Sequence, residues 1–211
     1  TKSVTTMYQM FWNCTSLAKL DLSKFNTSNV KSMASMFQQC SALTSIDVSS
    51  FDTSNVTNMD NIFESCRSIT SLNLKNFTTK KLTSMVSMFQ SCYKLASLNI
   101  SNFDTSNVTT MQSLFSRCNS LGNLDLSKFD TTKVTSMDQM FFNCYKINTK
   151  LAIRNKSMKV YSYLSILSGA ARETGSKIVL DYTSETSDIV DQLIQTASSN
   201  SNISKGSLLA S

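Results

Sequence analysis

Residues 29–54 read NVKSMASMFQQCSALTSIDVSSFDTS, and residues 55–80 read NVTNMDNIFESCRSITSLNLKNFTTK. The second stretch repeats the first, with the same kinds of residue at the same places. All six cysteines, at positions 14, 40, 66, 92, 118 and 144, follow this step of 26 residues, as do columns of Val, Met and Phe. Self-similarity at a period of about 20 to 50 residues is typical of a repeat protein. We therefore expect a solenoid in which each unit packs against its neighbours alone.

The first half of each repeat has apolar residues at helical spacing. Such spacing predicts a helix of about three turns with one buried face. Ser28 and Asn29 precede it, and their side-chain oxygens make them candidate N-caps. The apolar residues of this segment in the unit quoted above are Val30, Met33, Met36, Phe37 and Cys40.

The second half of each repeat predicts a short strand, because Ile46 and Val48 alternate around Asp47. Leu43, Ile46 and Val48 also fit the L-x-x-L-x-L core that, at this period, is typical of leucine-rich repeats. Stacked strands lie about 4.8 Å apart, whereas packed helices need roughly 8–10 Å. We therefore expect an α/β leucine-rich-repeat solenoid that bends, with a parallel sheet on its concave face and helices or helical turns on its convex face.

The residues that flank the apolar strand positions should point to solvent on the concave face. They would form three parallel ladders, and any macromolecular ligand is expected to bind there because short side chains on a rigid sheet have little ordering entropy to lose. The candidate ligand-binding residues are Lys19, Asp21, Ser23, Ser45, Asp47, Ser49, Ser71, Asn73, Lys75, Ser97, Asn99, Ser101, Asn123, Asp125 and Ser127.

The block S-M-x-x-M-F-x-x-C-x-x-L-x-x-L-D-L-S-x-F-D-T-S-x-V resembles the BspA-type leucine-rich repeats of bacterial surface proteins. It runs from Ser32 to Val56 and recurs across roughly residues 1–149, with Asn73 and Asn99 in place of Asp and with the pattern lost after Ile147. The resemblance implies a secreted or cell-wall-attached bacterial protein that binds a host or neighbouring-cell protein or glycan. It implies no enzyme and carries over no binding residues.

The cysteines admit three interpretations, of which a buried thiol that acts as a small hydrophobic group is the one we favour. A zinc site would need several thiolates at one point, whereas the repeat sets the cysteines in a line. A disulfide would need Cβ atoms within about 4.5 Å, and adjacent convex segments should lie farther apart. We therefore expect all six thiols to be reduced and protected.

Catalytic and metal sites have little support. The chain has no histidine and four glycines, and it lacks phosphate-binding and dinucleotide motifs. The ladder of Asp and Asn at 21, 47, 73, 99 and 125 could in principle hold calcium, but we favour carboxylates and amides that satisfy neighbouring polar groups. We predict no enzyme activity, no cofactor and no metal.

Charge and hydropathy limit the possible partners further. The net charge of +6 is spread over the whole chain, which argues against nucleic acid as a partner. No apolar run approaches the roughly 20 residues that span a bilayer. Thr1 lies partway into a repeat, so we interpret the chain as a fragment whose export signal and anchor lie elsewhere.

Residues 150–211 leave the repeat and are predicted to cap it. The pattern predicts a helix over 158–171, a strand over 177–182 and a helix over 188–196. Phe142 replaces the polar or small residues of the internal repeats, so we expect it to pack against one of the two helices. The alternative to a cap is a small adapter domain with contacts of its own.

These observations predict a bacterial cell-surface module for adhesion or recognition, made of a solenoid of about five and a half repeats over 1–149 and a C-terminal segment over 150–211. The alternatives are a structural spacer that projects another domain from the cell wall and a C-terminal adapter that carries the interaction.

Overall fold

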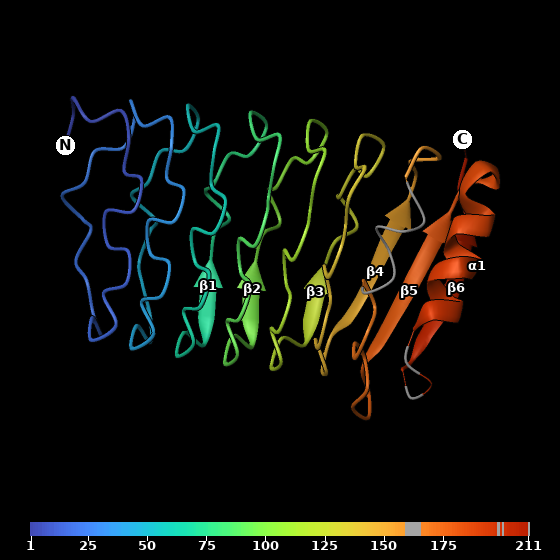
Figure 1. The fold of residues 1–211 in the computed structure, drawn as a ribbon. Helices are drawn as coiled ribbons and strands as arrows, with labels where there is room; N and C mark the ends of the chain where they lie inside the picture. Colours follow the sequence, from blue (N-terminus) through green and yellow to red (C-terminus); the bar gives the residue numbers. More distant parts are fainter. Residues whose placement is uncertain (159–165, 198, 200, 211) are drawn as a thin grey trace.

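The computed structural model describes residues 1–158, 166–197, 199 and 201–210. Its repeats stand side by side in one row from the N-terminal to the C-terminal end (Figure 1). Strands of successive repeats run parallel: β1 (Ser71–Asn73) pairs with β2 (Ser97–Asn99), and β3 (Asn123–Asp125) pairs with β4 (Asn148–Ile153). The predicted parallel solenoid with a 26-residue repeat is confirmed, as a β-solenoid.

The other half of each repeat is not a helix, and this corrects the prediction of helices on a convex face. Residues 1–158 contain turns and no helix. Every second N–H of the turn segment donates to a carbonyl of the next repeat, while the N–H groups between them bond back three residues. The donor and acceptor pairs between the second and third repeats are Met33 to Asn58, Ser35 to Asp60, Phe37 to Ile62 and Gln39 to Glu64, at 2.7 to 3.0 Å.

Left-handed residues explain why a helical pattern misled the prediction. Ser35 and Gln39 have φ values of 56° and 64°, and each is the third residue of a turn closed by an N–H that bonds back to Met33 or Phe37. A turn with positive φ only at its third residue is type II. Two such turns in a row place apolar side chains three and four residues apart on one side, as a helix does. Positive φ recurs at Gln9, Asn13, Asn61, Ser65, Ser87, Ser91, Ser113, Arg117, Gln139 and Asn143.

The expected cause of bending disappears with the helices. The turn segments bond directly to those of the neighbouring repeats, so the turn side has no need of the wider spacing of packed helices. The predicted N-caps have another role: the side-chain amide of Asn29 donates to the carbonyl of Lys2 at 2.8 Å, and that of Asn55 donates to Ser28 at 2.8 Å. These asparagines join repeats rather than cap helices.

The core lies between the turn side and the strand side. Its centre is a column of stacked phenylalanines, with ring centroids 5.5 to 6.1 Å apart and nearly parallel planes. Offset stacking of this kind adds to the area that each ring buries. The column consists of Phe11, Phe37, Phe63, Phe89, Phe115 and Phe141.

All six cysteines are free, and five of them are buried. Each buried thiol donates to the carbonyl of the phenylalanine in the preceding repeat, for example Cys92 Sγ to Phe63 at 3.1 Å. Burial raises the pKa of Cys40 to about 11 and that of Cys92 and Cys144 to about 12. Cys14 is exposed, which corrects the expectation that all six are protected.

A column of buried threonines was not anticipated. The hydroxyl of Thr79 donates to the Asp104 carbonyl at 2.9 Å and accepts from the Asp104 N–H at 2.8 Å. Thr27, Thr53 and Thr105 bond in the same way, and Thr131 bonds Ala152 and Arg154. These hydroxyls join successive repeats at the corner that follows the strands.

The C-terminal segment continues the solenoid. Strand β5 (Lys177–Tyr182) and helix α1 (Ser187–Thr196) confirm two predicted elements. A short 3-10 helix, η2 (Ser184–Thr186), precedes α1, and strand β6 (Ile203–Leu208) follows it. The sheet runs β3-β4-β5-β6, so the predicted boundary at 149/150 falls inside β4.

The predicted helix over 158–171 lies partly outside the described residues, because 159–165 are not among them. Residues 166–169 form turns, and the N–H groups of Phe141 and Asn143 donate to Ile166 and Ser168 as in the preceding repeats. Gly169, with φ of 71°, occupies the left-handed position of Asn143 one repeat later. Phe142 is half-buried, and its described partner is the guanidinium of Arg117, 5.7 Å from the ring centre.

Candidate ligand groove on the sheet face

The residues predicted to line the sheet face do reach its surface. Fourteen of the fifteen are exposed, and Asn99 is half-buried. The buried apolar positions alternate with them, as in β1, where Leu72 is buried between the exposed Ser71 and Asn73. The exposure of these side chains is confirmed, whereas their contact with a ligand stays a prediction.

The Asp and Asn ladder on this face has a structural task. Each side chain accepts the backbone N–H two residues later, as Asp47 does from Ser49 at 2.9 Å and Asn73 from Lys75 at 3.3 Å. Hydrogen bonds from Ser49 lower the pKa of Asp47, and those from Ser127 lower the pKa of Asp125. These bonds fix the turn at the end of every strand, in agreement with the role we favoured. Asp21, Asn99 and Asp125 bond likewise.

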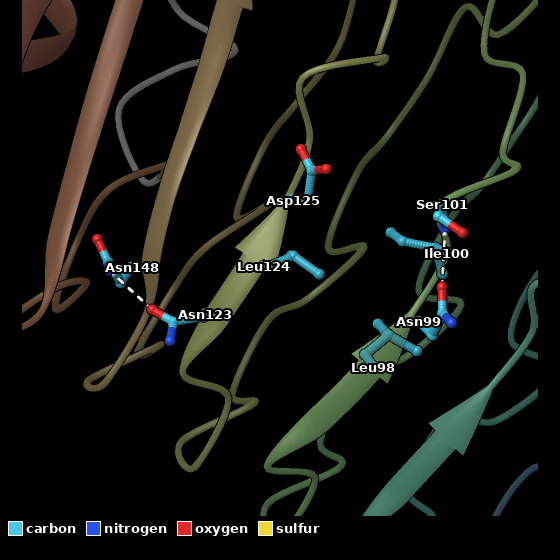
Figure 2. A pocket seen from close by; sticks show the side chains of 8 residues that line it. All are labelled: Leu98, Asn99, Ile100, Ser101, Asn123, Leu124, Asp125 and Asn148. Carbon is cyan, nitrogen blue, oxygen red and sulfur yellow. Dashed lines mark hydrogen bonds between the residues drawn. The ribbon is translucent and has the colours of Figure 1, made fainter.

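The sheet is interrupted between β2 and β3. Strands β1 and β2 form one sheet, while β3, β4, β5 and β6 form another. A groove of about 380 Å³ lies over this interruption (Figure 2). Its walls are residues 98–101, 123–125 and Asn148. Of the predicted site residues, the groove therefore brings together Asn99, Ser101, Asn123 and Asp125.

The groove combines an apolar floor with polar walls. Leu98 and Leu124 are 8% and 4% exposed, and they lie between the polar side chains in Figure 2. The amide of Asn148 donates to Asn123 Oδ1 at 2.8 Å, which orients both side chains. Asp125 carries the one formal charge among the lining residues. A few amide and carboxylate groups around an apolar surface suit a ligand rich in hydroxyl or amide groups.

Sequence reasoning missed Asn148 because its strand begins where the repeat motif ends. The sequence does carry a signal for the groove itself: Gly122 is the one glycine within the repeats, at a position where the others have Ala18, Thr44, Thr70 and Ala96. Nothing lies within 4 Å of the place that a Cβ at Gly122 would occupy. Gly122 directly precedes β3, and a glycine at a strand leaves room for the close approach of another molecule.

The remaining candidate residues are distributed along the rod. Asp21, Ser23, Asp47 and Ser49 share a second, smaller hollow of about 130 Å³ between the first two strand segments. Lys19, Ser45, Ser71, Asn73, Lys75 and Ser97 line neither hollow, and Ser127 borders another depression beside Arg154. The fifteen predicted residues thus share one face but not one site.

The described part of the chain lacks two further features, namely a cluster of metal-ligating side chains and a helix able to span a membrane. No group of three or more His, Cys, Asp or Glu side chains within it is arranged to hold a metal ion. None of its helices has the length and apolar character needed to cross a bilayer.

The fold defines a class: a parallel β-solenoid, here with a shallow groove on its strand face. A family model described as "Mycoplasma protein of unknown function, DUF285" matches residues 1–97 and 61–178. The chain belongs to this family. A search of curated proteins and a search of solved structures found no match.

Proposed function

We propose that this protein is a bacterial cell-surface recognition module that binds a protein or glycan through its strand face. The observation that carries the proposal is the groove over the interruption between β2 and β3, where amide side chains surround an apolar floor. The resemblance of the repeats to BspA-type surface proteins supports the same function and an extracellular location.

The rigidity of the frame favours binding. Hydrogen bonds join each repeat to the next along the turn side and at the threonine corner, and the Asx turns fix the side chains at the strand ends. A preformed surface loses little conformational entropy when it binds. The open, shallow shape of the groove suits an extended ligand such as a glycan chain or a peptide segment.

Binding can be tested with an array of purified glycans and extracellular matrix proteins. The variant Asn123→Trp fills the groove from an exposed strand position, and Ser71→Trp places the same side chain at the equivalent position of β1. We expect Asn123→Trp to abolish binding to the ligand found and Ser71→Trp to retain it. Both variants should keep the melting temperature of the wild type.

Two outcomes would support the alternatives. If Asn123→Trp binds as tightly as the wild type, the groove is not the site, and the C-terminal adapter becomes the stronger candidate. If the wild type binds nothing on the array, the spacer function gains support.

A further inference from the structure

A second surface of the rod concentrates positive charge away from the groove. It is the edge at which each turn segment passes into a strand, where the arrows of β1, β2 and β3 begin in Figure 1. Three of the four arginines of the chain lie there, with two lysines. We call this surface the basic edge and define it by Arg67, Lys94, Arg117, Lys146 and Arg172, all exposed.

Acidic side chains neutralise only part of the charge of the basic edge. The segments that lead from a turn segment into a strand contain two acidic residues, Glu64 and Glu173. These segments are residues 64–70, 90–96, 116–122, 142–148 and 168–174. Glu64 accepts a hydrogen bond from Gln38 and is half-buried, and burial raises its pKa. Glu173 lies 3.7 Å from Lys146. The edge therefore keeps an excess of positive charge that the neutral or mixed-charge strand face does not have.

Aromatic rings hold two of the guanidinium groups in place. Arg67 lies over the ring of Tyr93 with 5.8 Å to its centre, and Arg117 lies over Phe142 at 5.7 Å. Hydrogen bonds with Ser91 and Arg117 and the positive charges of Arg117 and Arg67 lower the pKa of Tyr93. The guanidinium of Arg67 rests on a ring and keeps its N–H fork free for an oxyanion, whereas that of Arg117 also donates to the hydroxyl of Tyr93.

The row of cationic and aromatic side chains continues toward the C-terminal end, at equivalent positions of the later repeats. Tyr145 occupies the position of Tyr93 two repeats later, about 10 Å farther along the rod at the spacing of parallel strands. Arg172 and Glu173 lie beside Tyr145 around a hollow of about 330 Å³. Cationic groups thus recur in a line parallel to the axis of the solenoid.

We propose that the basic edge binds a sulfated polysaccharide along the rod. Sulfate groups match the N–H forks of the arginines, and a linear polymer with regularly spaced anionic groups matches a linear array of cations. The arginine over Tyr93 occupies a ring face on which a nucleobase would otherwise stack, which favours a polyanion without bases over single-stranded nucleic acid. This site is separate from the groove and independent of its function.

The probe for this proposal is heparin, titrated into the full chain at physiological salt. We compare the wild type with the triple variant Arg67→Gln, Arg117→Gln, Arg172→Gln. The matched control is the triple variant Lys24→Gln, Lys31→Gln, Lys80→Gln. It removes the same number of positive charges, but from exposed residues outside the basic edge. We expect the arginine variant to bind about tenfold more weakly or worse, and the lysine control to bind within about twofold of the wild type. Melting curves verify that all three proteins are folded.

Three further measurements complete the test. Chemically desulfated heparin should bind far more weakly than heparin, and Asn123→Trp should leave heparin binding unchanged. Replacing the three arginines by lysine should restore part of the affinity, because charge remains while the planar fork is lost. The proposal is overturned if both triple variants lose affinity equally, if the wild type does not bind heparin, or if single-stranded DNA binds the edge more tightly than heparin.

Discussion

The turn side and the strand side of this solenoid are made by the same repeats, yet they differ in continuity. On the turn side, inter-repeat hydrogen bonds continue from the first repeat to Ile166 and Ser168, well beyond the end of the sequence motif. On the strand side, the ladder stops between β2 and β3 and the groove opens. The comparison shows that the turn side acts as the frame, and that the strand side can vary because the frame does not depend on it.

The largest effect should come from the phenylalanine column of the frame. Phe89→Ala removes a fully buried ring stacked on Phe63 and Phe115, and we expect a loss of about 3–5 kcal/mol in the free energy of unfolding. Leu98→Ala beside the groove, where the floor is already open, should cost about 2 kcal/mol. Urea unfolding of both variants measures the difference. Equal losses would show that the strand side is as important to stability as the turn side.

A smaller effect is expected at the corner between the two sides. Thr79→Val preserves shape but leaves the N–H and the carbonyl of Asp104 without their partner, so the free energy of unfolding should fall by about 1–3 kcal/mol. Thr44→Val, at an exposed position, serves as the control and should change it by less than about 0.5 kcal/mol. A neutral Thr79→Val would mean that the threonine column does not join the repeats energetically.

The buried thiols make the frame sensitive to alkaline pH. Because burial raises the pKa of Cys92 from 9.0 to about 12, the unfolded chain releases this proton at a pH where the folded protein still holds it. Stability from this thiol is therefore complete below pH 9 and falls as the pH rises above it, by about 1.4 kcal/mol per pH unit. Unfolding between pH 8 and pH 11 tests this slope. It should be shallower in Cys92→Ala; an identical slope would contradict the assignment.

The smallest effect belongs to the interruption of the strand side. Gly122→Ala places a methyl group in open space and reduces the freedom of the unfolded chain, so the protein should become more stable by about 0.4–1 kcal/mol. A calorimetric melting curve is sensitive enough to detect the shift. Destabilisation would show that the backbone at Gly122 needs a conformation that alanine resists.

The contrast between the two sides also explains what the sequence could predict. The strand side was predicted correctly in its alternation and exposure, because a period of two has one structural meaning and Leu72 between Ser71 and Asn73 obeys it. The turn side was predicted wrongly, as a helix. Consecutive type II turns place apolar residues at the same spacing as a helix does, as at Met33, Met36, Phe37 and Cys40. The signal that separates them, positive φ at Ser35 and Gln39, falls on residues that have no preference for it.

The groove could be predicted only in part. The face on which a strand residue lies follows from its local sequence, whereas an interruption of strand pairing depends on the neighbouring repeats. Four of its polar residues follow from the ladder pattern, namely Asn99, Ser101, Asn123 and Asp125. Asn148 required knowledge that the sheet continues past the motif, and the gap itself depends on which neighbouring strands pair. Gly122, the one glycine within the repeats, was a visible signal. Sequence reasoning missed the basic edge because its charges are separated by about one repeat in the sequence.

The direction of the hydrogen bonds between turn segments has a consequence for the gene. In the middle of the turn segment, each repeat donates N–H groups to the repeat that follows and presents carbonyls to the one that precedes, so the turn segments of different repeats are complementary to one another. In-frame recombination between two repeats therefore adds or removes whole units without creating a new kind of junction. Each exchange changes the length of the rod by about 4.8 Å and leaves its two ends intact. The reach of such a protein can be adjusted by copy number alone.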